Sequence, residues 1–183
     1  MKRTINNLLL FRIPEKYMDP AMAQRLNIEL QKLAARGLTV ISTSGDLGVS
    51  DSVGCDQAYA DFPSSSPFTT SVGSTRIAPS DSIPLCSSYQ FYGLPIECNT
   101  KLKEIPCTAD NGCAFTTGSG FSQLFSMPSY QSNLINNYIK TSNLHVTFNS
   151  SGRAYNDVSA LGSNVIIVNN GKLSISWGTS ASG

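Results

Sequence analysis

Residues 38–48 read Leu38-Thr39-Val40-Ile41-Ser42-Thr43-Ser44-Gly45-Asp46-Leu47-Gly48, a short apolar run that passes directly into a glycine-rich turn. The residues before it predict a helix, with Asp19 placed to cap it, Pro20 to open it and Gly37 to stop it. Helix, strand and glycine-rich loop in this order form half of a β-α-β unit, so we expect an α/β fold with a mostly parallel sheet covered by helices. In such sheets ligands bind beyond the carboxyl ends of strands, where residues 44–48 fall.

Two helices are expected from the apolar periodicity. The helix of residues 20–36 carries an apolar stripe made of Met22, Leu26, Leu30 and Leu33. A second helix is predicted over residues 128–140, with Tyr130, Leu134, Ile135 and Tyr138 in phase. Residues 1–18 show no clean period and receive no assignment.

Turn chemistry indicates the strands. A β-rich strand is expected near residues 69–73, and residues 153–161 are interpreted as a turn-and-cap stretch. Residues 165–168 and 172–176 flank Asn169-Asn170-Gly171, which predicts a β-hairpin.

This hairpin leads into residues 177–183, which read Trp-Gly-Thr-Ser-Ala-Ser-Gly. A strand that runs into Gly-Thr-Ser suits the presentation of a nucleophile, because glycine permits a sharp turn and a helix beginning at the serine aims free N–H groups at an oxyanion. Ser180 is therefore the candidate nucleophile. The alternative is an ordinary helix cap, for which Ser and Thr are the commonest residues.

The composition is that of a globular domain. The chain has 183 residues, of which 40% are hydrophobic and 14% charged, and a net charge of +1 without a block of one sign. Nothing in it favours nucleic acid or a membrane as a partner, and no apolar run reaches the ~20 residues of a spanning helix. Residues 8–11 are too short for the apolar region of a signal peptide, so the chain as written is expected to lack an export signal.

Five cysteines contain no C-x-x-C pair, which argues against a zinc site. Four of them fall in a turn-rich segment, residues 76–117, that we interpret as a surface insertion; they predict two local disulfides with three connectivities open, among Cys86, Cys98, Cys107 and Cys113. Cys55 is left over. Together with the single glycosylation sequon at Asn149, the cysteines favour a lysosomal or secreted protein.

The loops at Asp46 and Ser180 resemble those of the sedolisin family of serine-carboxyl peptidases. Further blocks resemble the family in the family's own order, at residues 24–39, 62–67, 120–122 with 128–131, and 151–160. The resemblance implies a subtilisin-like three-layer fold, here a partial peptidase catalytic domain over residues 1–183 that is incomplete at both ends.

The resemblance also implies the chemistry. Ser180 would form an acyl-enzyme on a peptide or protein substrate, and Asp46 would donate a hydrogen bond to the oxyanion, which a carboxyl can do only while protonated. Acidic pH is therefore implied, with a Glu supported by an Asp as the base. The family's Ca²⁺ ligands would all lie beyond residue 183, so this chain is expected to hold no metal.

Each candidate has a structural alternative. Asp46 could simply satisfy turn amides. Asp157 is interpreted as structural, because the family motif at residues 157–160 is not catalytic. His145 lies among polar residues and is expected to be solvated, which disfavours a Ser-His-Asp triad.

The base is missing from this sequence. Glu15 and Asp19 have the spacing of two carboxylates on one helical face. However, Pro14 and Pro20 flank them and they lie where the family has a linker, so we do not assign them as the base. The chain alone is therefore expected to be inactive, and tripeptidyl-peptidase and endopeptidase action stay open. The competing hypothesis is a non-catalytic secreted binding module of the same fold. An α/β hydrolase would require Gly-x-Ser-x-Gly, which residues 178–182 do not supply.

Overall fold

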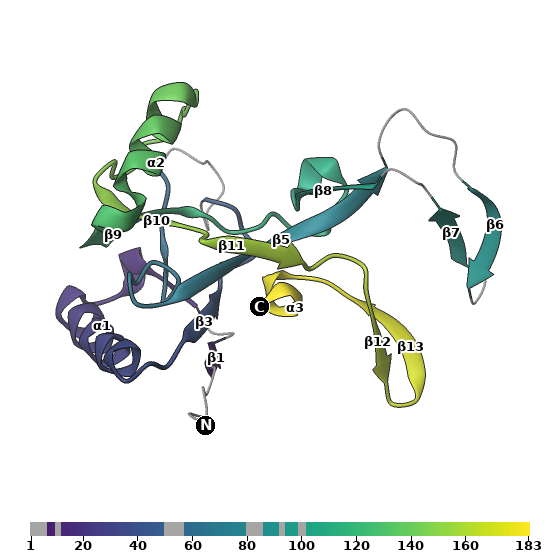
Figure 1. Ribbon diagram of the computed structural model, residues 1–183, viewed down its shortest axis with the longest axis horizontal. Coiled ribbons are helices and arrows are strands. Elements are labelled where there is room, and N and C mark those ends of the chain that lie inside the picture. Colours follow the sequence, from purple (N-terminus) through teal and green to yellow (C-terminus); the bar gives the residue numbers. More distant parts are fainter. Residues whose placement is uncertain (1–6, 10–11, 50–56, 80–85, 92–93, 99–101) are drawn as a thin grey trace.

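The computed structural model describes residues 7–9, 12–49, 57–79, 86–91, 94–98 and 102–183 (Figure 1). Its helices are η1 (Glu15–Tyr17), α1 (Pro20–Ala35), η2 (Ala109–Asn111), α2 (Ser129–Thr141) and α3 (Thr179–Ser182). Its strands are β1 (Asn7–Leu9), β2 (Ile13–Pro14), β3 (Val40–Thr43), β4 (Asp61–Phe62), β5 (Thr70–Pro79), β6 (Cys86–Phe91), β7 (Leu94–Cys98), β8 (Leu102–Pro106), β9 (Gly120–Ser126), β10 (Gly152–Tyr155), β11 (Val158–Leu161), β12 (Val165–Asn169) and β13 (Lys172–Ser176).

The central sheet confirms the expected α/β class with a mostly parallel sheet. Its order is β1-β3-β5-β11, and all three of these pairings are parallel. Strand β8 joins the sheet antiparallel to β5. Because β3, β5 and β11 run in one direction, their carboxyl ends meet at one edge of the sheet. Helix α3 lies against these three strands (Figure 1).

The interpretation of residues 153–161 as turns and caps is wrong. The segment contains part of β10 and all of β11, which pairs with the centre of β5 from Val158 opposite Val72 to Leu161 opposite Thr75. A four-residue strand has too little alternation to be recognised locally, and this one is specified by its pairing with β5.

The segment of residues 76–117 only partly projects from the fold. Its first and last strands belong to the central sheet, since residues 75–79 of β5 pair with β8. The β6–β7 hairpin extends away from the sheet in Figure 1. Cys107 and Cys113 form one disulfide, as expected. The backbone register places Cys86 opposite Cys98, the pairing that remains for the second predicted disulfide. Cys55 lies outside the described residues.

Helix α1 begins and ends as predicted. The Asp19 carboxylate accepts a hydrogen bond from the Met22 N–H at 2.8 Å, and Gly37 follows the helix with φ +77°. The buried stripe differs from the expected one, because Met22 and Leu26 are exposed while Ala23 and Leu30 are buried. Alanine at position 23 lets the helix approach the aromatic core closely.

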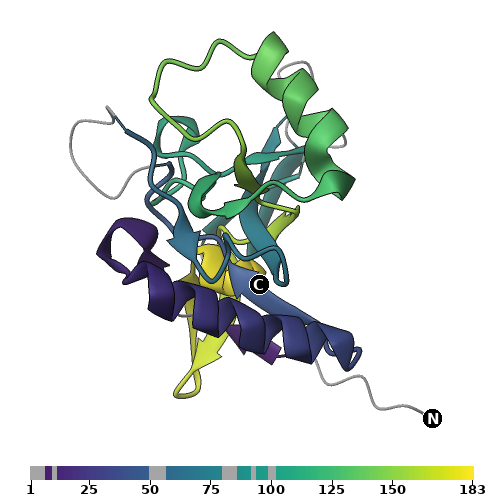
Figure 2. The same cartoon turned by 90° about the vertical axis from the view of Figure 1, so that its left-hand side faces the viewer.

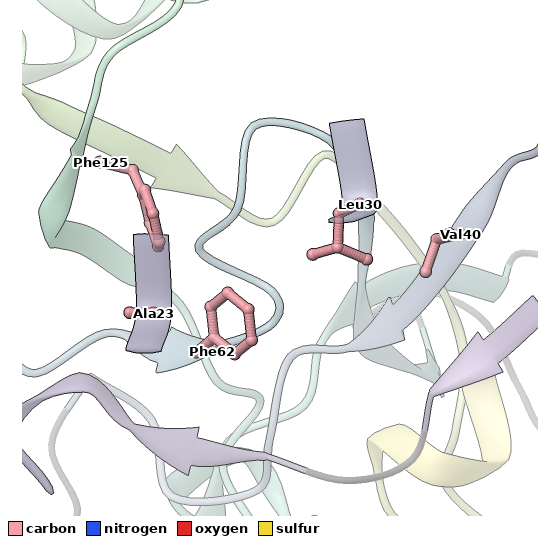
Figure 3. Close-up of a cluster of buried hydrophobic side chains, with 5 residues drawn as sticks. All are labelled: Ala23, Leu30, Val40, Phe62 and Phe125. Atoms are coloured by element: carbon pink, nitrogen blue, oxygen red, sulfur yellow. The ribbon is translucent and has the colours of Figure 1, made fainter. Parts of the chain in front are cut away.

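That core consists of Ala23, Leu30, Val40, Phe62 and Phe125 (Figure 3). The two phenylalanine rings lie 6.0 Å apart between their centroids and are tilted by 38°. In Figure 2, α1 and α2 lie on opposite sides of the molecule.

Helix α2 is confirmed, but its predicted apolar stripe is wrong in part. Tyr130, Leu134 and Tyr138 are exposed, and Gln131 is the buried residue. The Gln131 amide donates to the Ala154 carbonyl at 3.0 Å and accepts from the Ala154 N–H at 2.9 Å. A buried side-chain amide thus attaches α2 to the edge of β10. Of the helices in the described part of the chain, none has the length and apolar character needed to cross a bilayer.

The fully buried guanidinium of Arg153 ties β10 to the loop before β5. It donates to the carbonyls of Ser66 and Thr69 and to the Asp157 carboxylate at 2.6 Å, and Asp157 also accepts from the Ser71 N–H at 2.7 Å. Asp157 is therefore structural, as expected.

We expect Arg153→Met to lower the free energy of unfolding by about 3 kcal/mol, because it removes the guanidinium donor to Asp157 and to the carbonyls of Ser66 and Thr69. Lys32→Met is the matched control, since its ion pair with Glu29 is exposed and should contribute less than about 1 kcal/mol. Urea unfolding measures both; equal effects would contradict the structural role of Arg153.

Candidate active site

The turn that carries Asp46 follows β3 at the carboxyl edge of the sheet. The Ser44 N–H continues the strand pairing by donating to the Val72 carbonyl at 3.0 Å. Gly45 then turns the chain with φ +96°, a conformation that favours glycine. The Gly45 carbonyl accepts from the Gly118 N–H at 2.6 Å, and the Asp46 carbonyl accepts from the Thr116 N–H at 3.2 Å. The backbone of the turn is thus fixed on both sides of Asp46.

The turn that carries Ser180 arrives from the β12–β13 hairpin, which is confirmed with Asn170 and Gly171 both at positive φ. Gly178 has φ +118°, and its N–H donates to the Gly162 carbonyl at 2.9 Å. A Cβ at Gly178 would lie 3.1 Å from Asp46 Oδ2, so a side chain at this position would crowd the carboxyl group.

The two turns meet through Thr179. Its N–H donates to Asp46 Oδ1 at 2.7 Å, and its hydroxyl donates to the same oxygen at 2.9 Å. The hydroxyl also accepts from the Gly45 N–H at 3.1 Å, across 134 positions of sequence. Thr179 is buried, Asp46 is half-buried and Ser180 is exposed. The structure therefore brings the Asp46 and Ser180 turns together.

The hydrogen bonds distinguish the two oxygens of Asp46. Oδ1 accepts twice from Thr179, while Oδ2 lies against Gly178. When the carboxyl is protonated, its O–H is therefore favoured on Oδ2. The role of the Thr179 hydroxyl could not be predicted from the local sequence, because its partner Asp46 lies 133 positions away in the chain.

An ion pair that the sequence did not reveal lies against the Asp46 turn. Arg12 Nη1 and Asp61 Oδ2 are 2.7 Å apart, and a Cβ at Gly45 would lie 2.8 Å from that same oxygen. The Tyr155 hydroxyl accepts from the Asp61 N–H at 3.0 Å. Burial, and then the negative charge of Asp61, raise the pKa of the Tyr155 hydroxyl well above its ordinary value. These residues come from four separate segments, so only the tertiary structure groups them.

Glu15 and Asp19 have roles other than that of a paired base. Glu15 is buried and accepts hydrogen bonds of 2.6 Å from the Ser122 hydroxyl and the Gln123 N–H. Burial raises its pKa, and these hydrogen bonds lower it by a smaller amount. Asp19 caps α1. The two carboxylates therefore serve separate structural positions.

The remaining candidates lie away from the two turns. His145 is exposed, as expected. The Asn149 side chain accepts from the Ser151 hydroxyl at 2.8 Å and donates to the Ser122 carbonyl at 2.9 Å, and its glycosylation stays a prediction. Within the described residues no three His, Cys, Asp or Glu side chains gather in a way that could hold a metal ion.

Comparison with known proteins identifies relatives that match most of this chain. The sequence is 35% identical over 175 residues to physarolisin of Physarum polycephalum, covering 86% of this chain and 29% of that protein. It is 36% identical over 176 residues to human tripeptidyl-peptidase 1, covering 92% of this chain and 26% of that protein. No protein-family model matches the sequence.

The solved structure of Pseudomonas sedolisin, a serine-carboxyl proteinase complexed with two molecules of pseudo-iodotyrostatin, superposes with a TM-score of 0.68 at 22% identity. The match covers 97% of this chain and 44% of the sedolisin chain, which shows that the fold is shared. The chain belongs to the sedolisin family. It spans between a quarter and a third of the length of these two relatives, 29% of physarolisin and 26% of human tripeptidyl-peptidase 1.

We expect Thr179→Val to lower the free energy of unfolding of this sedolisin-family chain by about 1–3 kcal/mol, because it leaves the buried Gly45 N–H without an acceptor and removes one donor to Asp46. Thr179→Ser keeps the hydroxyl and should recover most of the loss. Urea unfolding compares the three proteins; a valine variant as stable as the original would show that the hydroxyl does not join the turns.

Glu15→Gln provides a pH-dependent prediction. The folded protein holds the Glu15 proton to higher pH than the unfolded chain, because burial raises the pKa above 4.5. The quantity to follow is the free energy of unfolding of the original protein minus that of Glu15→Gln. This difference should be highest below pH 4.5 and should fall as the pH rises through the pKa of Glu15 in the folded protein. Urea unfolding over an acid-to-neutral series tests this, and a difference that grows with pH would contradict it.

Proposed function

We propose that this chain supplies the nucleophile Ser180 and the oxyanion acid Asp46 of a serine-carboxyl peptidase that acts on peptides or proteins at acidic pH. The observation that carries the proposal is the attachment of Asp46 to Thr179, the residue directly before Ser180. This attachment favours a geometry in which one carbonyl group lies between the serine hydroxyl and the free oxygen of Asp46.

In the proposed reaction the Ser180 Oγ attacks the scissile carbonyl carbon while a base removes its proton. The carbonyl oxygen becomes an oxyanion and accepts a hydrogen bond from protonated Asp46 Oδ2, the oxygen that Thr179 leaves free. Collapse of the tetrahedral intermediate breaks the C–N bond, the amine leaves with a proton, and water hydrolyses the acyl-enzyme. Acidic pH is required because Asp46 donates only in its protonated form.

The base in this proposal comes from outside the described residues. Glu15 and Asp19 are engaged by Ser122 and by the first turn of α1. Loss of a general base alone reduces rates by ~10²–10⁴, so we expect no measurable turnover from this chain by itself. The Ca²⁺ implied by the family would likewise take its ligands from beyond residue 183.

An acidic, oxidising setting suits both the chemistry and the Cys107–Cys113 disulfide, so we propose a lysosomal or secreted location. Tripeptidyl-peptidase and endopeptidase action both fit this site.

A second candidate is a non-catalytic binding module of the same fold. It is favoured by the structural use of both Glu15 and Asp19, which leaves the two turns assembled without those carboxylates as a base. The module would bind peptides without cleaving them.

A chimera separates the two candidates. Replacing the matching segment of human tripeptidyl-peptidase 1 with this chain lets the host supply a base and the remainder of the fold. We expect hydrolysis of a tripeptide amide at acidic pH, abolished by Ser180→Ala. Asp46→Asn, which lacks the carboxyl proton, should reduce kcat by about 10²–10³.

Ser182→Ala is the matched control, because Ser182 is the other serine of α3 and its hydroxyl donates to the Thr179 carbonyl at 3.0 Å within the helix. It should retain most of the activity. A folded chimera that is inactive, or one in which Ser180→Ala has no effect, would favour the binding module.

A further inference from the structure

An aromatic stack borders the candidate site. The rings of Trp177 and Phe115 lie 5.9 Å apart between their centroids with an interplanar angle of 19°. Phe115 is buried with the Cys107–Cys113 disulfide, whereas Trp177 is 53% exposed. The indole is therefore stacked on a buried ring, while about half of the Trp177 surface remains exposed to solvent.

Each member of the stack directly precedes a residue that contacts Asp46. Phe115 precedes Thr116, whose N–H donates to the Asp46 carbonyl. Trp177 precedes Gly178, which lies against Asp46 Oδ2. The stack is thus fixed by the same two turns that bring Ser180 and Asp46 together, and Trp177 lies three positions before Ser180 in the chain.

The exposed indole continues an apolar surface of the β12–β13 hairpin. Ile166 pairs with Ile175 and Val168 pairs with Leu173, so each pair shares one face of the ribbon. Leu173 and Ile175 lie on one face of β13, and Trp177 follows directly after the last residue of that strand, Ser176. These five side chains are all exposed, and all are apolar. The hairpin projects from the molecule in Figure 1.

We propose that Trp177, backed by Phe115, forms a binding surface for a large apolar or aromatic side chain of a peptide whose backbone extends to Ser180. The apolar hairpin face beside it would extend this preference to neighbouring side chains, whereas a charged side chain would lose hydration there without gaining a partner. The choice of a peptide as occupant rests on the proposed function, while the surface itself rests on the stack and its exposure.

Intrinsic fluorescence tests the proposal without turnover, because Trp177 is the only tryptophan of the chain. The probes are acetylated, amidated hexapeptides of alanine that carry a single Phe, or a Glu in its place. We expect the Phe peptides to change the Trp177 emission saturably and the Glu peptides to bind more weakly. Phe115→Ala should weaken binding by roughly 2- to 10-fold, since it removes the support of the indole.

Two variants of Trp177 test whether binding depends on this residue, with peptide binding measured by calorimetry. Trp177→Ser should lose binding of the Phe peptides, and Trp177→Phe should retain it. Tyr17→Ala is the matched control, because Tyr17 is an exposed aromatic residue of η1 and should leave binding unchanged.

Equal responses to Phe and Glu peptides, no response at millimolar peptide by a folded chain, or an emission change that depends only on the concentration of the chain itself would each overturn the proposal. The last outcome would identify a second copy of the chain as the occupant. Peptide binding together with an inactive chimera would support the Trp177 binding surface and reject the peptidase reaction. An active chimera with no preference for Phe peptides would support the peptidase reaction and reject the Trp177 binding surface.

Discussion

The hydrogen bonds between Thr179 and the Asp46 turn are the contact on which the candidate site depends. Asp46 follows a sheet strand, whereas Thr179 follows a projecting hairpin and begins a helix of only four residues. Such short segments have little stability of their own. Three hydrogen bonds made by one buried threonine therefore define where Ser180 lies relative to the carboxyl group.

That contact is available only because the surrounding backbones approach one another closely. A Cβ at Gly118 would lie 2.0 Å from the Ser44 carbonyl oxygen, and one at Gly162 would lie 2.8 Å from the Gly178 carbonyl oxygen. Both values are shorter than any side chain tolerates, so glycine is required on each side of the site. The parallel order of β3, β5 and β11 supplies the common edge at which these turns gather. The geometry of the site therefore depends on the topology of the sheet.

Local sequence signals were sufficient to predict the elements whose ends carry characteristic cap or turn residues. Asp19, Pro20 and Gly37 define α1, and Asn170 with Gly171 defines the β12–β13 turn, because caps and tight turns depend on a few adjacent residues. The orientation of α1 and the existence of β11 were not predictable in this way. Both depend on partners far away in the chain, Phe125 for the helix and Val72 for the strand. The Arg12–Asp61 ion pair and the role of the Thr179 hydroxyl could not be predicted for the same reason.

The carboxyl groups of this chain show why residue type alone does not determine the chemical role of a carboxyl group. Glu15 is buried against hydroxyl and amide donors, Asp157 is paired with Arg153, and Asp61 is paired with Arg12. Each of these carboxylates has its hydrogen-bonding capacity directed at the fold. Asp46 differs because Thr179 occupies one oxygen and leaves the other beside Gly178, at the turn that presents Ser180. A carboxyl that is anchored through one oxygen can hydrogen-bond through the second without losing its position, which is the property that the proposed oxyanion role of Asp46 requires.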